Sequence, residues 1–164
     1  MFTASRPASM PKLARLVARL CLPAGAALLL SATASRPALA QQTSFVVVVN
    51  GANLMSSISR SELAALFTKK EQSFSDGTPA FPVDLPDDDP VHEAFTQAVH
   101  GKSPRAIRSY WQQQIFSGRN VPPPQRSSDD QVLAYVRTTV GAIGYVRATA
   151  RLGPGIKVLG LVAR

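Results

Sequence analysis

Short runs of apolar residues alternate with longer stretches of helical spacing along most of this chain. Phe45–Val49 is a continuous, largely β-branched run, which predicts a strand buried on both faces of a sheet. Ala80–Leu85 predicts a short strand, and its Pro82 favours an edge or a strand start because proline cannot donate to the hydrogen-bond ladder. Ile156–Leu161 predicts a last strand.

The first helical stretch begins with a complete set of start signals. Ser59 is a favourable N-cap, and Glu62 three residues later completes a capping box. Ile58 and Leu63 occupy the two positions of a hydrophobic staple. Lys69–Lys70 suits the negative end of the helix dipole, so we expect the helix to run from Ser59 to about this pair.

Three further helices are predicted by caps, prolines and glycines. Asp89 and Ser103 stand directly before a proline, which is the arrangement of an N-cap and a first helical residue. The expected helices run from Asp89 to Gly101, from Ser103 to Gly118, and from Ser128 to about Thr138. Strands that alternate with helices predict an α/β domain with a mainly parallel or mixed sheet.

Thr138–Val146, with the sequence TTVGAIGYV, leads from the last predicted helix into an apolar strand. Gly141 and Gly144 predict a tight turn between the two, because glycine adopts positive φ and lets the backbone pass close to a neighbour. The isoleucine, tyrosine and valine around them suit a half-buried pleated surface.

The first forty residues have the pattern of a signal peptide. Basic residues precede an apolar segment, Leu20–Leu30, which is too short for an ordinary membrane span. Ala38–Ala40 supplies an A-x-A cleavage site, so Gln41 is the expected mature N-terminus. An N-terminal membrane anchor and initiation at Met10 stay open as alternatives.

Charge and cysteine content change once this segment is set aside. The net charge is +8, but five of the eighteen Lys and Arg residues precede Gln41, which leaves thirteen against ten acidic residues. So small an excess of positive charge does not indicate a nucleic-acid-binding protein. Cys21 is the only cysteine and lies in the apolar segment, so the mature domain has no disulfide or thiolate chemistry. The expected organisation is a signal peptide at 1–40 and one periplasmic domain at 41–164.

Five segments follow the layout of a known family in their order and spacing. They are VVVVN at Val46–Asn50, SISRSELAALFTKK at Ser57–Lys70, FSDG at Phe74–Gly77, VHEAF at Val91–Phe95 and TTVGAIGYV at Thr138–Val146. Together they resemble the phosphate ABC transporter substrate-binding proteins. Full proteins of this type are clamshells with two α/β lobes and a ligand between them, and the resemblance covers the second lobe. It implies a short, single-lobe member with a periplasmic-binding-protein-like fold.

The resemblance also implies a ligand site and partners. The candidate ligand-binding residues are Asn50, Ser56, Ser57, His92 and Tyr145. The implied ligand is phosphate or another small anion, and the implied partner is an ABC permease or another envelope protein. No nucleic acid partner is expected, and no stable membrane insertion is expected after cleavage.

The loop before the fourth of these segments departs from the family pattern. The family places a Ser-Gly-Thr run here, so that hydroxyls and a helix N-terminus meet the phosphate. This chain has Asp89, Pro90, Val91 and His92 instead, and the aspartates at 87–89 would repel an anion and satisfy the helix dipole. His92 is either a source of positive charge or an exposed histidine on the helix surface. We therefore do not expect tight phosphate binding.

Other patterns predict neither an enzyme nor a cofactor. Lys102, Arg105 and Arg108 lie near one another on a helix, either as an anion-binding group or as a solvated basic face. His92 and His100 lack further ligands nearby in sequence, so no metal site is predicted. The chain contains no G-x-S-x-G nucleophile elbow.

Two functions follow from these observations. The first is a periplasmic solute-binding-like protein that resembles the phosphate transporter component and does not hold phosphate tightly. The alternative is a single-lobe sensor or adaptor of the envelope that acts through protein contacts.

Overall fold

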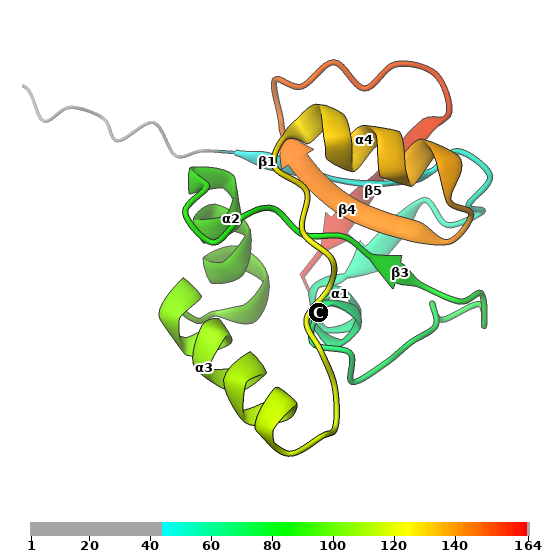
Figure 1. Cartoon of the computed structure of the whole chain (residues 1–164). Helices are drawn as coiled ribbons and strands as arrows, with labels where there is room; N and C mark the ends of the chain where they lie inside the picture. Colours follow the sequence, from blue (N-terminus) through cyan, green and yellow to red (C-terminus); the bar gives the residue numbers. More distant parts are fainter. Residues whose placement is uncertain (1–43, 164) are drawn as a thin grey trace, which may run out of the picture. The chain divides into compact units, whose positions relative to one another are not determined.

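The computed structural model describes residues 44–163, so the predicted signal peptide and its cleavage site lie outside the described residues. These residues form one sheet with the strand order β2-β5-β1-β4-β3 (Figure 1). The strands are β1 (Phe45–Asn50), β2 (Ser57–Ser59), β3 (Phe81–Pro82), β4 (Ala142–Arg147) and β5 (Ile156–Val162).

The strand pairing makes this a mixed sheet. β1 is central and runs antiparallel to both β4 and β5. The edge strands β2 and β3 run parallel to β5 and β4, respectively. Val48 and Val49 are fully buried, as the apolar run predicts, and Pro82 lies in an edge strand, as predicted. The expected α/β fold with a mixed sheet is confirmed.

The helices begin at the predicted caps. They are α1 (Arg60–Phe67), α2 (Pro90–Phe95), α3 (Pro104–Phe116) and α4 (Asp129–Thr138). The side chains of Ser59, Asp89, Ser103 and Ser128 each accept a backbone N–H of the helix that follows. α2 continues as a π-helical segment, Thr96–His100, labelled η1, and stops at Gly101 with a φ of 61°. No helix within residues 44–163 has the length and apolar character needed to cross a bilayer.

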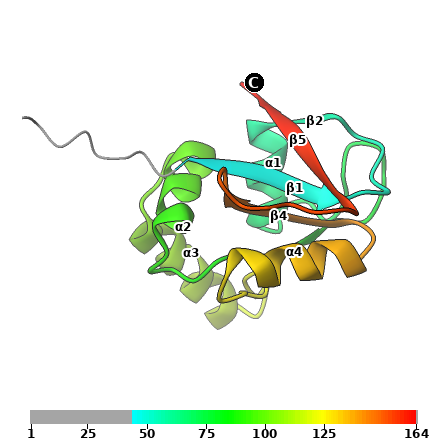
Figure 2. The ribbon, with the colours of Figure 1, turned by 90° about the horizontal axis from the view of Figure 1, so that it is seen from above.

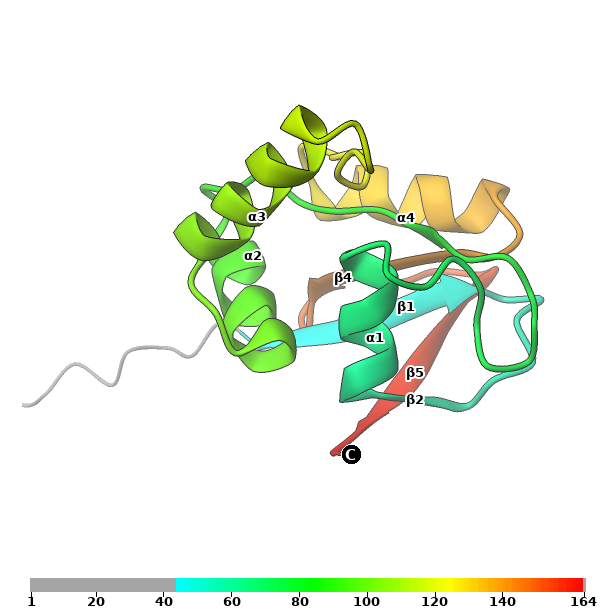
Figure 3. The same cartoon turned by 90° about the horizontal axis from the view of Figure 1, so that it is seen from below.

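Helices cover both faces of the sheet (Figures 2 and 3). Gly144 of β4 faces α4, where a Cβ atom would lie 2.8 Å from Cγ1 of Val132. Tyr145 faces the other side and stacks on Phe95 of α2 at a centroid distance of 3.8 Å. Its ring also lies 5.8 Å from that of Phe67 in α1. The second face therefore brings Tyr145 next to α2 and the loop that precedes it.

Three local predictions differ from the structure. Glu62 does not complete the capping box, because its carboxylate accepts the backbone N–H of Ser75 at 2.9 Å, where the chain folds back. α1 ends at Phe67, before the lysine pair, and Lys69 takes a left-handed conformation with a φ of 53°. The strand expected at residues 80–85 is only two residues long, because the backbone beyond it pairs with the segment that precedes α4.

Candidate functional site

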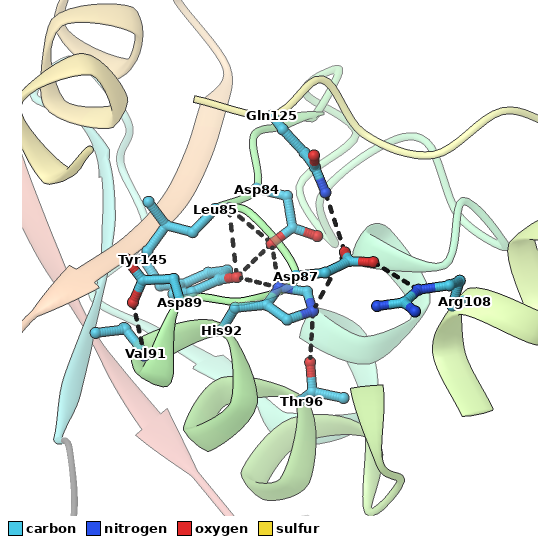
Figure 4. Close-up of polar contacts among 10 residues, drawn as sticks. All are labelled: Asp84, Leu85, Asp87, Asp89, Val91, His92, Thr96, Arg108, Gln125 and Tyr145. Carbon is cyan, nitrogen blue, oxygen red and sulfur yellow. Dashed lines mark hydrogen bonds and ion pairs between the residues drawn. The ribbon is translucent and has the colours of Figure 1, made fainter. Parts of the chain in front are cut away.

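The loop between β3 and α2 carries a group of acidic side chains that converge with residues of α2 and β4 (Figure 4). Asp84 lies just beyond β3, and Asp89 is the N-cap of α2. His92 projects from α2 and Tyr145 from β4. The backbone fixes the start of this loop, because Val83 donates its N–H to the carbonyl oxygen of Ile143 at 2.9 Å.

Asp84, His92 and Tyr145 form a buried hydrogen-bonded triad. The Tyr145 hydroxyl donates a hydrogen bond to Oδ1 of Asp84. Nδ1 of His92 lies 3.1 Å from the same oxygen and 2.9 Å from the Tyr145 hydroxyl. Leu85 adds its backbone N–H to Oδ1 of Asp84 at 2.9 Å. These contacts hold Oδ1 of Asp84, the His92 ring and the Tyr145 hydroxyl together inside the protein.

Burial and nearby charges shift the pKa values of two residues of the triad, His92 and Tyr145. Burial lowers the pKa of His92, but the hydrogen bond and charge of Asp84, with the charges of Asp87 and Asp89, outweigh it, so this pKa is raised overall. Burial, followed by the charge of Asp84, raises the pKa of Tyr145. Tyr145 is therefore a neutral phenol at physiological pH, and it serves as a hydrogen-bond donor.

Asp87 is held on the outer side of the triad. Nε of Arg108 donates to its Oδ2 at 2.9 Å, and Nε2 of Gln125 donates to its Oδ1 at 3.2 Å. Nε2 of His92 lies 3.9 Å from Oδ1 of Asp87 and 3.4 Å from the Thr96 hydroxyl. These contacts connect the loop to α3 and to the segment before α4.

Asp89 occupies the place where a helix N-terminus would meet an anion. Its Oδ1 accepts the backbone N–H of Val91 at 2.8 Å. Nη2 of Arg147 contacts both carboxylate oxygens of Asp89, at 2.9 and 2.8 Å. Nη1 of Arg147 lies 3.0 Å from Oδ1 of Asp129 in the first turn of α4. The hydrogen bonds that Arg147 donates to the carboxylates of Asp89 and Asp129 raise the pKa of Arg147. Internal carboxylates thus neutralise both the helix start and the nearest guanidinium.

The structure brings together two of the five predicted site residues, His92 and Tyr145. Asn50 is engaged elsewhere, since its Nδ2 donates to the carbonyl oxygens of Val136 and Arg137 at the end of α4. Ser56 and Ser57 are exposed at the edge strand β2 and its approach. These three do not share in the contacts of the triad within the described residues.

The expectation of an exposed histidine at position 92 is wrong, because His92 is 3% exposed. α2 turns this side chain toward Tyr145 of β4, and a sequence does not show which flank of a helix the sheet covers. Asp84 and Arg147 were not predicted as site residues. A carboxylate inside an apolar run and a cation that ends a buried strand were the available signals.

The described residues contain no group of three His, Cys, Asp or Glu side chains placed to hold a metal ion. The triad and its neighbours therefore present carboxylate acceptors, one histidine and paired guanidinium groups.

Comparison with known proteins shows similarity at the level of fold. No protein-family model matches the chain, and no curated protein matches it. A protein from Clostridium perfringens, described as a phosphate ABC transporter substrate-binding protein and solved with bound phosphate, superimposes with a TM-score of 0.56 at 13% identity, over 71% of this chain and 44% of its own. An ABC-type phosphate transport receptor from Vibrio cholerae gives a TM-score of 0.56 at 13% identity, over 71% and 45%.

A third solved structure, PstS from Borrelia burgdorferi, gives a TM-score of 0.53 at 10% identity, over 71% of this chain and 46% of its own. The chain thus spans less than half of the length of each of these three proteins. Identities this low establish the fold alone. In its fold, the described domain is a periplasmic-binding-protein-like lobe.

Proposed function

We propose that this chain is a periplasmic solute-binding-like protein, related to the binding component of phosphate ABC transporters, that does not hold phosphate tightly. The similar solved structures support a binding role rather than a catalytic one, because they are described as a substrate-binding protein and a transport receptor. One of them was solved with bound phosphate.

The observation that carries the proposal is the pairing of Asp89 with Arg147. An anion that binds a helix N-terminus uses free backbone N–H groups and a nearby cation. Here the Asp89 carboxylate accepts the N–H of Val91 and lies 2.8 Å from Arg147. Phosphate would have to displace an internal carboxylate that is already in place.

The charge of the loop adds to this cost. Asp87 and Asp88 stand directly before Asp89, so an approaching phosphate meets three carboxylates in succession. The described residues form one lobe and supply one wall of a clamshell. An anion held by this wall alone stays partly in water, where each charge-assisted hydrogen bond contributes less. We expect a dissociation constant no tighter than roughly millimolar, which corresponds to about 4 kcal/mol of binding.

The test is isothermal titration of the exported protein with inorganic phosphate. Wild type is expected to give no saturation below the millimolar range. Asp89→Ser restores a hydroxyl cap and frees Arg147, and it is expected to bind phosphate at least about tenfold tighter. Asp88→Ser is the matched control, because it removes one charge from the same loop and leaves the contact between Asp89 and Arg147 intact.

Micromolar phosphate binding by wild-type monomer would overturn the proposal. Equal gains in phosphate affinity from Asp89→Ser and Asp88→Ser would show that general charge repulsion, rather than the pairing of Asp89 with Arg147, weakens phosphate binding. The mass of the protein in solution, measured on the same samples, identifies any second copy that supplies the other wall.

The proposal includes export to the periplasm and cleavage after Ala40, supported by the A-x-A site and the short apolar segment. N-terminal sequencing of the periplasmic protein is expected to begin at Gln41. Recovery of an intact N-terminus in the membrane fraction would reject cleavage.

An ABC permease or another envelope protein is the proposed partner, by analogy with the transport receptors of similar fold. No contact among the described residues favours the sensor or adaptor alternative.

A further inference from the structure

A cavity of about 380 Å³ lies between α3, the loop that carries Asp84, and the proline-rich segment before α4. Its polar end is formed by Asp84, Asp87 and Arg108, and its apolar wall by Ile107, Trp111 and Pro123. Sites for small molecules are typically about 300–1,000 Å³ and combine apolar walls with a few polar groups. The cavity has the size and the composition of such a site.

The two carboxylate oxygens of Asp84 have different surroundings. Oδ1 accepts from the Tyr145 hydroxyl and the backbone N–H of Leu85 and lies 3.1 Å from Nδ1 of His92. Oδ2 has no hydrogen bond or ion pair to any residue that the structure describes. Figure 4 shows this second oxygen on the side of Asp84 away from Tyr145. The Asp84 side chain is only 14% exposed, so a partner for this oxygen would come from within the cavity.

The other charged groups of the cavity each have at least one contact inside the protein. Arg108 lies 2.9 Å from Asp87, and the second oxygen of Asp87 accepts from Gln125. His92 directs Nδ1 toward Oδ1 of Asp84, and its Nε2 lies near Thr96. Oδ2 of Asp84 is therefore the open acceptor at the polar end, and a charged N–H donor is the group that fits it best.

The apolar wall suits the body of such a donor. Trp111 and Ile107 are each 8% exposed, and consecutive prolines at 122 and 123 make the opposite side stiff. We propose that this cavity binds a small organic cation, a protonated amine with a compact apolar body, whose ammonium contacts Asp84 and whose body packs against Trp111. The inference rests on the proposed solute-binding function and assigns its ligand class.

Three probes of the same shape test the charge requirement on the exported protein. They are cyclohexylmethylamine, cyclohexylmethanol and cyclohexanecarboxylate, which are cationic, neutral and anionic at neutral pH. Trp111 is the only tryptophan in the chain, so its fluorescence reports occupancy of the cavity directly. The amine is expected to bind saturably and at least about tenfold tighter than the alcohol, and the carboxylate more weakly than either. Titration calorimetry repeats the comparison without the fluorophore.

Matched variants test the position of the charge. Asp84→Asn is expected to reduce amine affinity about tenfold, whereas Asp88→Asn removes the same charge from an exposed position in the same loop and leaves affinity unchanged. Circular dichroism checks that each variant is folded, and if Asp84→Asn unfolds, the three probes on wild type decide the question alone.

Equal binding of amine and alcohol, an equal loss in both variants, or no saturable amine binding would overturn the inference. The phosphate titration fails or succeeds independently of these results. Tight phosphate binding without amine binding would reject both proposals, whereas weak phosphate binding without amine binding would reject the ligand class alone.

Discussion

Gly141 illustrates how a single residue without a side chain sets the geometry between α4 and β4. Its φ is +83°, in the left-handed region that other residues rarely adopt, and a Cβ atom there would overlap the carbonyl oxygen of Pro79. Gly144 is different, because it lies within β4 and its importance is the close approach of Val132 and Val83. The first glycine is required by backbone conformation and space, the second by packing alone.

Gly141→Ala is therefore expected to destabilise the protein more than Gly77→Ala. Gly77 has nearly the same φ, +84°, but nothing lies within 4 Å of its missing Cβ. The control should cost about 1–2 kcal/mol for the backbone conformation alone. The overlap with Pro79 should add about 1–3 kcal/mol at position 141. Urea unfolding of both variants measures the difference, and equal losses would contradict this view of the turn.

His100 gives a prediction for pH dependence. Burial lowers its pKa to about 4, from an ordinary value of 6.5. As the pH falls, His100 is protonated in the unfolded chain before it is protonated in the folded protein. The stability linked to neutral His100 is therefore fully present above about pH 6.5 and is lost as the pH falls toward about 4. We expect His100→Gln to remove this loss, which amounts to no more than about 3 kcal/mol.

Unfolding of wild type and His100→Gln across that pH window measures the effect, and parallel curves would show that His100 does not cause the loss. Titration of His92 does not interfere with this comparison, because it affects stability in a different pH range. Its pKa is raised in the folded protein, so its contribution is present below its unfolded value and is lost only as the pH rises through the folded value.

At the scale of elements, the caps explain where the helices begin. The Ser59 hydroxyl accepts the backbone N–H of Glu62 at 3.1 Å. Ile58 and Leu63 beside it are at most 1% exposed. The cap and the buried pair fix the entry into α1. Glu62 itself accepts from Ser75, so it connects the helix to the following loop rather than to its own start.

Ser59→Ala is expected to lower the free energy of unfolding by about 1 kcal/mol, because it leaves a helix N–H without its partner. Ser56→Ala is the control, since Ser56 is exposed and is not a helix cap. Chemical denaturation of both compares them directly. A loss shared equally by the two variants would mean that the cap contributes nothing.

At the scale of the whole domain, Arg147 connects elements that are distant in sequence. It ends β4 and contacts Asp89 at the start of α2 and Asp129 at the start of α4. Each carboxylate also lies at the positive end of a helix dipole, so this group of charges stabilises two helix starts and their position on the sheet. The same group explains why the domain offers no free guanidinium to phosphate at this place.

We expect Arg147→Gln to destabilise the domain by about 1–2 kcal/mol at low salt, and less in high salt, where the charges are screened. Arg108→Gln is the matched control, because within residues 44–163 Arg108 forms an ion pair with one carboxylate, that of Asp87, and its side chain is 56% exposed. Its loss should be smaller, within the range of about 0–1 kcal/mol for exposed pairs. Thermal unfolding at two salt concentrations measures both, and a salt-independent loss would contradict the electrostatic explanation.

The sequence by itself determined the local features of this protein. The N-caps Ser59, Asp89 and Ser128 depend on contacts within a few residues. The apolar run before Asn50 and the positive φ at Gly141 follow from residue types that a short stretch of sequence displays, so these patterns are readable without a structure. The same patterns predicted the α/β class, because alternation of strands and helices has few packed solutions.

Only the tertiary structure decided which polar side chains meet. Tyr145 and Asp84 are 61 residues apart, and Arg147 and Asp89 are 58 apart. Asn50 was expected at a ligand site, but its amide is used at the end of α4. These partnerships depend on strand order, on register and on the flank of α2 that faces the sheet. Packing of the whole chain fixes all three, and no short stretch of sequence contains that information.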